Sequence, residues 1–231
     1  MQSRPADRRS RFITLEGPDG AGKSVQAARL AALLRAAGVT VTLTREPGGT
    51  PLGERIREVL LVGDDPPRTA ESDALLFNAA RSQLVRDVIA PALARGETVI
   101  CDRFADSTVA YQGYGSGLDR QELRQLERLA TGGLRPDVIL LLDLPVVTGL
   151  ARRARGAPDQ LNRFERSRDH DQAFHERVRQ GYLEMAADDP HRWRVVDARA
   201  DTNAVTEEIS RFFRVTAPPS EPTATPLRIT S

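Results

Sequence analysis

The sequence has one cysteine, one lysine and no long apolar run. A single cysteine, Cys101, excludes an intramolecular disulfide and favours a reducing compartment, and its apolar surroundings predict a place in the core. No apolar stretch reaches the roughly 18 residues that a helix needs to cross a bilayer. Residues 1–11 are basic but lack the apolar region of a secretory signal. We therefore expect a cytoplasmic protein that makes no membrane contact.

The net charge and the length of the chain exclude further classes of protein. The 33 basic and 32 acidic residues give a net charge of +1, which argues against nucleic-acid binding driven by bulk charge. The 231 residues suffice for one sizeable α/β domain and are too few for two domains with linkers. The sequence shows no internal repeat. The only lysine, Lys23, lies in a glycine-rich segment, where it is unlike a solvated surface charge.

That segment fits the phosphate-binding loop pattern G-x-x-x-x-G-K-[ST] at every fixed position. It consists of Gly17, Pro18, Asp19, Gly20, Ala21, Gly22, Lys23 and Ser24. In this pattern the glycines let backbone amides face phosphate oxygens, the lysine reaches the β- and γ-phosphates, and the serine hydroxyl can bind Mg²⁺. An apolar run at 12–16 predicts a buried strand before the loop, and the leucine spacing over 25–37 predicts a helix after it. Because this order places phosphates at a helix N-terminus, the sequence indicates a nucleotide-binding protein.

Strand-like and helix-like segments alternate along the chain. Strands are predicted at 12–16, 39–43, 97–101, 138–142 and 194–196, and helices at 51–61, 69–95, 119–131, 146–155, 169–187 and 202–214. This order predicts an α/β fold with a five-stranded parallel sheet and helices on both faces. We expect a flexible basic segment at 1–10, one domain at 11–214, and a disordered tail rich in Pro, Ser and Thr at 215–231.

Ligands of such sheets bind at the carboxyl ends of the strands, so polar residues there are candidates for the site. Arg45 opens the tight loop 45–50 after the second predicted strand and could bind a second anionic group. Asp102 and Arg103 follow the third predicted strand. The carboxylate can hold the hydration shell of Mg²⁺, and the guanidinium can clamp a phosphate. A helix N-cap is the alternative for Asp102 alone, but its neighbour Arg103 favours the site.

Two side chains on the long predicted helix suggest a base pocket. Phe77 and Arg81 are four residues apart and so share a helix face. They could hold a planar base through ring stacking and carbonyl recognition. The alternative is that Phe77 belongs to the core and that Arg81 is solvated.

The arginine-rich segment 152–168 surrounds a Gly-Ala-Pro break. It could be an exposed loop, but in a phosphate-loop enzyme it favours a mobile lid whose arginines neutralise charge on the transferred phosphoryl group. Of the three histidines, His170 and His175 are five residues apart and do not share a helix face, so a surface location is favoured over a metal site.

Together these residues resemble the thymidylate kinase (dTMP kinase) family over roughly residues 12–213. The matching pieces are 17–24, Arg-Glu-Pro-Gly-Gly-Thr at 45–50, Phe77 with Arg81, Asp-Arg-Phe at 102–104, Ser-Thr at 107–108, Ala-Tyr-Gln-Gly at 110–113, the lid arginines, and Asn-Arg-Phe-Glu at 162–165. The pieces at 45–50 and 110–113 are more specific than the phosphate loop. The resemblance implies a P-loop kinase fold, transfer of the γ-phosphoryl of Mg·ATP to dTMP in dTTP biosynthesis, and a homodimer.

The resemblance also implies a role for each matching residue. At the base, Phe77 would stack on thymine and Arg81 would bond a ring carbonyl, with Ser107, Thr108 and Gln112 near the substrate. At the sugar, Tyr111 would sit against C2′ and Asp19 would face the 3′-hydroxyl. Arg45 and Arg103 would hold the acceptor phosphate. Lys23, Arg103 and the lid arginines Arg153 and Arg155 would carry catalysis, and Ser24 and Asp102 would serve Mg²⁺. The lid arginines match the bacterial type, because the fourth loop position, an arginine in the other type, is Gly20 here. Between Glu165 and Phe174 the predicted lid is about two residues longer than the family pattern, with Arg166 and Arg168 where acidic residues are commoner.

Two rival interpretations stay open at the level of sequence. A kinase of the same fold could act on a deoxynucleoside or another monophosphate, although Arg45 and Arg103 favour a charged acceptor. A P-loop ATPase or switch would bind nucleotide without a metabolite acceptor.

Overall fold

A computed structural model describes residues 11–61, 68–155 and 172–214. Its centre is a parallel five-stranded sheet in the order β2-β3-β1-β4-β5. The strands are β1 (Phe12–Glu16), β2 (Val41–Arg45), β3 (Thr98–Asp102), β4 (Val138–Asp143) and β5 (Trp193–Asp197). The predicted α/β class and the five-stranded parallel sheet are confirmed.

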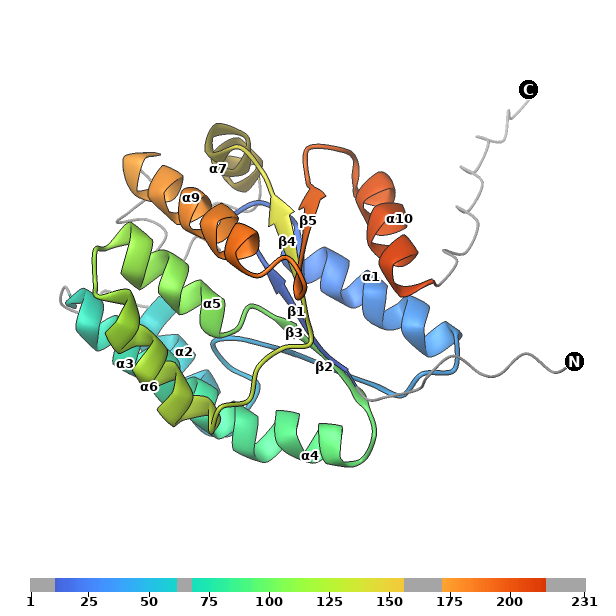
Figure 1. Ribbon diagram of the computed structural model, residues 1–231, viewed down its shortest axis with the longest axis horizontal. Coiled ribbons are helices and arrows are strands. Elements are labelled where there is room, and N and C mark those ends of the chain that lie inside the picture. Colours follow the sequence, from blue (N-terminus) through green and yellow to red (C-terminus); the bar gives the residue numbers. More distant parts are fainter. Residues whose placement is uncertain (1–10, 62–67, 156–171, 215–231) are drawn as a thin grey trace, which may run out of the picture.

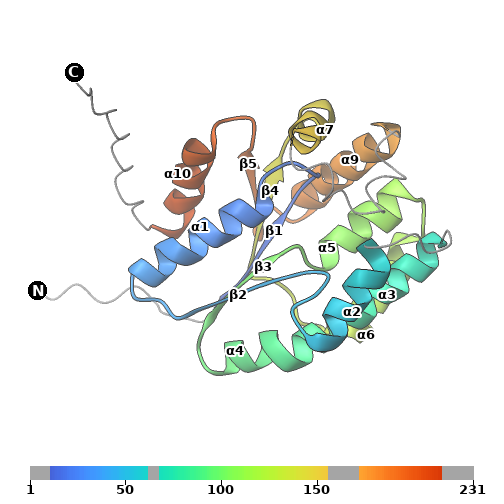
Figure 2. The ribbon, with the colours of Figure 1, turned by 180° about the vertical axis from the view of Figure 1, so that it is seen from behind.

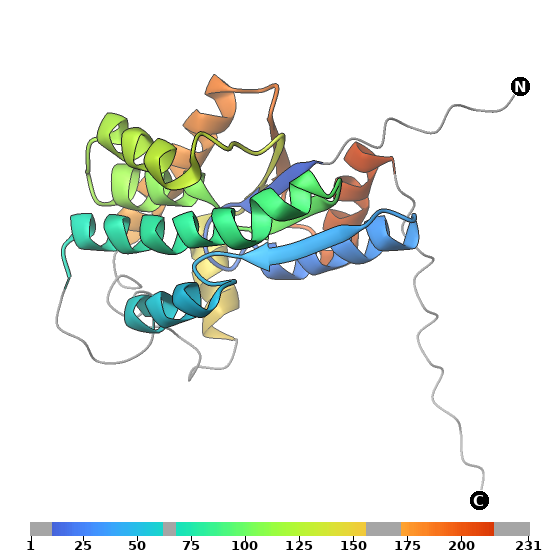
Figure 3. The same cartoon turned by 90° about the horizontal axis from the view of Figure 1, so that it is seen from below.

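Helices cover both faces of this sheet (Figure 1). They are α1 (Lys23–Ala36), α2 (Pro51–Leu61), α3 (Ala70–Leu84), α4 (Ala90–Ala94), α5 (Ala105–Thr108), α6 (Arg120–Thr131), α7 (Val146–Ala154), α9 (Gln172–Asp188) and α10 (Thr202–Phe213), with π-helical turns η1 (Val85–Ile89) and η2 (Val109–Gly115). Figure 2 shows α1 and α10 together on one side, with α3, α6 and α9 on the other. In Figure 3, α3, η1 and α4 form one continuous rod, which confirms the single long helix predicted at 69–95.

The core follows the period-two alternation of the strands. Ile13, Ile100 and Leu140 face α1 and α10 in one apolar cluster. Their neighbours Phe12 and Cys101 belong to a second cluster, on the opposite face. Cys101 is fully buried, as predicted. Among the described helices, none combines the length and the apolar character needed to span a bilayer.

The strands that carry the candidate residues end later than predicted. β2 runs from Val41 to Arg45 rather than over 39–43, and β3 includes Asp102. The reason is pairing, because Arg45 lies opposite Asp102 in the β2–β3 register. Arg45 and Asp102 are therefore the last residues of their strands, and not the first residues of the loops that follow.

Residues 105–115 are helical, which the sequence analysis did not predict. Glycines at 113 and 115 weaken the helical pattern, but tertiary packing favours the helix. A Cβ atom on Gly115 would lie 2.5 Å from the ring of Phe174. The missing side chain therefore lets α9 pack closely against η2.

Candidate active site

The phosphate-binding loop lies between β1 and α1, as predicted. Three of its glycines have positive φ: 138° at Gly17, 76° at Gly20 and 88° at Gly22. A Cβ atom on Gly17 would lie 2.4 Å from the Leu142 carbonyl oxygen, and one on Gly20 would lie 2.3 Å from that of Gly149. The loop therefore needs glycine both for its backbone conformation and for its close approach to neighbouring backbone.

Lys23 opens α1 and points back into the loop. Its Nζ donates to the carbonyl oxygens of Gly17 at 3.0 Å and Pro18 at 2.8 Å. Burial, and next the charge of Arg103, lower the pKa of Lys23 from 10.5 to about 8. A buried ammonium ion whose hydrogen bonds to the described residues go to neutral carbonyls is suited to receive an anionic phosphate.

Ser24 and Asp102 lie together at the end of β3. The Ser24 hydroxyl donates to Oδ2 of Asp102. Oδ1 of Asp102 is buried and has no hydrogen-bond partner among the residues that the structure describes, so a carboxylate oxygen stays available for a further ligand. The pair fits Mg²⁺, which usually takes one or two protein oxygens and completes its shell with phosphate and water. Among the described residues, no three His, Cys, Asp or Glu side chains gather into a self-sufficient metal site.

Arg103 reaches the phosphate-binding loop from the end of β3. Its guanidinium donates to Asp19 at 2.5 Å and to the Gly17 carbonyl oxygen at 3.4 Å. Arg153 of α7 also approaches Asp19, at 3.6 Å. Burial opposes ionisation of Asp19, but the charges of Arg103, Lys23 and Arg153 outweigh it and hold the pKa of that carboxyl at about 2. Two of the predicted catalytic arginines therefore meet at Asp19.

Arg81 is buried rather than solvated. Its side chain is 1% exposed, and it forms an ion pair with Glu46 at 2.7 Å. It also donates to Thr108 at 3.1 Å, while Phe77, one turn earlier on α3, is half-buried. The solvated alternative for Arg81 is wrong, because a tertiary carboxylate compensates its charge.

Arg45 occupies a more open position. It donates to Glu54 of α2 at 3.1 Å and to the Pro47 carbonyl oxygen at 3.2 Å, and its side chain is 44% exposed. An exposed ion pair of this kind contributes little to stability, so Arg45 can exchange Glu54 for another anion.

Known proteins share this arrangement of sequence and fold. Residues 15–209 match the sequence model of the thymidylate kinase family. A thymidylate kinase of Thermomicrobium roseum is 54% identical over 86% of this chain and 91% of its own, and one of Deinococcus radiodurans is 54% identical over 86% and 93%. The crystal structure of thymidylate kinase from Ehrlichia chaffeensis superposes with a TM-score of 0.73 at 35% identity, covering 89% of this chain and 99% of that one. The chain belongs to the thymidylate kinase family.

The P-loop kinase fold expected for the family is thereby established. Four of the substrate-side residues predicted from the resemblance, Ser107, Thr108, Tyr111 and Gln112, lie on the helical segment 105–115. The hydroxyl of Tyr111 accepts a hydrogen bond from Arg103 at 3.1 Å, and Ser107 accepts one at 3.2 Å. Nε2 of Gln112 is buried without a hydrogen-bond partner in the described part of the chain. Ser107 and Tyr111 thus lie beside the arginine predicted for the acceptor phosphate.

Sequence reasoning missed several residues of this site. Glu16 is fully buried at the end of β1, and its burial, followed by the charge of Asp106, raises its pKa from 4.5 to about 7. Tyr182 of α9 donates to Glu16 at 3.0 Å. Glu46 lay in a matched segment but had no role assigned to it. A carboxylate ending an apolar strand directly before the phosphate-binding loop was the one sequence signal available for Glu16.

The predicted surface location of the histidines is wrong for His175. That side chain is 4% exposed and packs edge-on against Phe174 at 5.3 Å between ring centres. Its position near the start of α9, where the helix packs against η2, explains the burial. His191, for which no location was predicted, is exposed, and His170 lies outside the described residues.

Of the predicted lid 152–168, the structure describes only residues 152–155. Arg155 is exposed at the end of α7, and Arg152 donates to the carbonyl oxygens of Ala198 and Arg199. The predicted lid residues from 156 onward, including 162–165, Arg166 and Arg168, lie outside the described residues.

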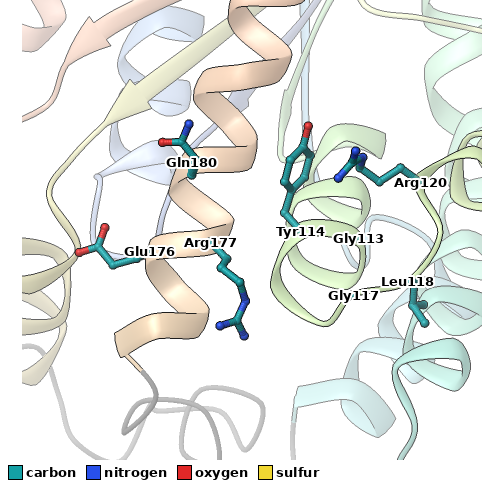
Figure 4. Close-up of a pocket in the computed structure, with 8 residues that line it drawn as sticks. All are labelled: Gly113, Tyr114, Gly117, Leu118, Arg120, Glu176, Arg177 and Gln180. Atoms are coloured by element: carbon teal, nitrogen blue, oxygen red, sulfur yellow. The ribbon is translucent and has the colours of Figure 1, made fainter.

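A separate cavity of about 540 Å³ lies between η2 and α9 (Figure 4). Its lining residues are Gly113, Tyr114, Gly117, Leu118, Arg120, Glu176, Arg177 and Gln180. None of them is among the predicted site residues, so this cavity is distinct from the phosphate-binding loop.

Proposed function

We propose that this chain transfers the γ-phosphoryl group of Mg·ATP to dTMP, giving dTDP and ADP. One observation carries the proposal beyond nucleotide binding. Arg103, the predicted clamp of the acceptor phosphate, contacts the donor loop directly at Gly17 and Asp19. Donor and acceptor phosphates would therefore lie next to each other, as phosphoryl transfer requires.

The donor half of the site holds ATP. Backbone amides of residues 17–24 and the Lys23 ammonium would bind its phosphates. Ser24 and Asp102 would hold Mg²⁺, which neutralises charge on the donor phosphates when bound. The unpartnered Asp102 oxygen supports this assignment.

The acceptor half holds dTMP. Arg45 and Arg103 would bind its phosphate, Asp19 would face the 3′-hydroxyl, and Tyr111 would exclude a ribose 2′-hydroxyl. Phe77 and Arg81 would hold thymine, with Ser107, Thr108 and Gln112 lining the pocket. The ion pair of Arg81 with Glu46 supports a neutral target, because a compensated guanidinium attracts an anion only weakly.

Catalysis in this scheme depends on charge and positioning rather than on a strong base. Lys23, Arg103, Arg153 and Arg155 would balance charge on the moving phosphoryl group. Arg153 already lies 3.6 Å from Asp19, beside Arg103, which supports its place in the set.

A panel of acceptors tests the function. ADP release would be followed with Mg·ATP and dTMP, dUMP, ribothymidine monophosphate, dCMP, AMP, GMP or thymidine, with Lys23→Met as the inactive control. We expect selective turnover of dTMP. Turnover of thymidine would refute the phosphate roles of Arg45 and Arg103, and ADP release indifferent to the acceptor would identify an ATPase or switch.

The proposal includes a homodimer of catalytic units formed by residues 11–214, acting in the cytoplasm. Exposed apolar side chains on three neighbouring helices support the dimer: Leu52 and Val59 on α2, Leu75 on α3 and Leu129 on α6 are 45–81% exposed. Sedimentation of Leu75→Asp and Leu129→Asp should show monomers. The control Val147→Asp changes an equally exposed side chain on α7 and should remain dimeric.

A further inference from the structure

Glu16 is a buried carboxylate that the proposed reaction does not use. Its side chain is 0% exposed, and no ion pair to it occurs among the described residues. It accepts three hydrogen bonds: from the Phe104 backbone N–H at 2.7 Å, from the Ser107 hydroxyl at 2.6 Å and from the Tyr182 hydroxyl at 3.0 Å. Burying a carboxylate costs free energy, which three donors partly offset. A group this costly to bury calls for a reason beyond packing.

The contacts of Glu16 surround the backbone of Arg103. That residue has φ of 67°, a left-handed conformation that is strained for a side chain other than glycine. Its own N–H donates to the Leu15 carbonyl oxygen at 3.0 Å, and the next N–H, of Phe104, donates to Glu16. The amides on either side of the Arg103 Cα atom are thus held by two successive residues of β1, Leu15 and Glu16.

This turn directs the Arg103 side chain toward the phosphate-binding loop. From it the guanidinium reaches Gly17 and Asp19, and it also touches the hydroxyls of Ser107 and Tyr182. Those two hydroxyls are the same ones that donate to Glu16. The carboxylate therefore accepts from the backbone N–H that follows Arg103 and from two hydroxyls that Arg103 itself contacts.

We propose that Glu16 is a positioning residue, whose carboxylate holds Arg103 in its left-handed turn and so keeps the guanidinium aimed at the acceptor phosphate. Tyr182 extends this support to α9. The inference rests on the proposed function, because it takes Arg103 as the acceptor clamp. It predicts that loss of Glu16 weakens the acceptor half of the site and leaves the ATP half intact.

The test compares three variants with the full-length wild type. Glu16→Ala removes the two oxygens that accept all three hydrogen bonds. Glu16→Gln keeps an amide oxygen to accept from the Phe104 N–H, while the Ser107 and Tyr182 hydroxyls can reorient to accept from its amide nitrogen. Tyr182→Phe removes one of the two hydroxyl donors. The matched control is Glu127→Gln, a buried carboxylate of α6 whose partner is Arg124. KM for dTMP, KM for ATP and kcat would be measured for each protein.

We expect Glu16→Ala to raise KM for dTMP at least about tenfold and to lower kcat, since small misplacement of a positioning group has large effects. KM for ATP should stay within about twofold, Glu16→Gln should restore most of the loss, and Glu127→Gln should match the wild type. Tyr182→Phe should raise KM for dTMP alone by about threefold, which provides a readout even if Glu16→Ala fails to fold.

Parallel rises in both KM values for Glu16→Ala and Tyr182→Phe, or unchanged dTMP kinetics in both, would overturn the positioning role. Failure of the proposed function is a separate outcome, because the wild type itself would then not turn over dTMP.

Discussion

Lys23 should take up a proton when ATP binds. Lys23 is 7% exposed, and its ammonium donates hydrogen bonds to two carbonyl oxygens. Burial together with Arg103 lowers its pKa to about 8. Triphosphate oxygens beside the ammonium favour its charged form, so binding should return the pKa to at least its ordinary 10.5.

The size of the effect follows from this pKa change. With a free pKa of about 8, ATP binding should take up about 0.1 proton at pH 7, about 0.5 at pH 8 and about 0.9 at pH 9. Affinity should fall about tenfold for each pH unit above 8, and the full shift of about 2.5 units corresponds to about 3 kcal/mol. Below pH 7 affinity should be independent of this group, because Lys23 is protonated in both states.

Calorimetry measures the uptake directly. Binding of a non-hydrolysable ATP analogue with Mg²⁺ would be compared at pH 7, 8 and 9 in buffers of low and high ionisation enthalpy. Lys23 is the only lysine, so Lys23→Met should abolish the uptake while other titrating groups are retained. Lys23→Arg stays charged across the range and should show none. Absence of uptake at pH 9 in the wild type, or equal uptake in Lys23→Met, would refute this account of the loop.

Three further predictions concern the carboxylates Glu46, Asp102 and Glu16. Glu46→Gln leaves Arg81 as an uncompensated buried charge and should lower the free energy of unfolding, measured in urea, by about 3–5 kcal/mol. The control Glu54→Gln breaks an exposed pair and should lower it by less than about 1 kcal/mol. Equal losses of stability in the two variants would show that burial of the Arg81 charge is not what matters. Asp102→Asn should raise the Mg²⁺ concentration for half-maximal rate at least about tenfold without changing dTMP affinity, measured by Mg²⁺ titration of the rate; an unchanged Mg²⁺ requirement would remove Asp102 from the site. Glu16 is protonated in the folded protein up to about pH 7 but ionised above 4.5 when unfolded, so its contribution to stability is lost as pH rises through this window. Denaturation of wild type and Glu16→Gln at pH 5 and 8 should therefore show the variant gaining relative stability at pH 8, by up to about 3 kcal/mol, and a constant difference would show that the pKa of Glu16 is not raised.

Local patterns predicted most of the fold. Each predicted strand overlaps an observed one. Apolar runs predict strands well because the apolar residues of the run are themselves the ones that the sheet buries. Errors lie where pairing or packing decides the boundary. β2 extends to Arg45 because it pairs with β3, and residues 105–115 are helical although glycines weaken their pattern.

By itself, the sequence determined the order of the strands and of the helices other than 105–115, the phosphate-binding loop, and the strand-end residues of the candidate site. These depend on contacts between near neighbours, which spacing reveals. Only the tertiary structure decided which charges are buried and what compensates them. Arg81 of α3 pairs with Glu46 in the loop after β2. Glu16 at the end of β1 binds the N–H of Phe104, just beyond the neighbouring strand β3. His175 is buried where α9 packs against η2. The charge state and orientation of such groups depend on burial and on hydrogen-bond donors that segments distant in the sequence provide. No local sequence pattern encodes these surroundings.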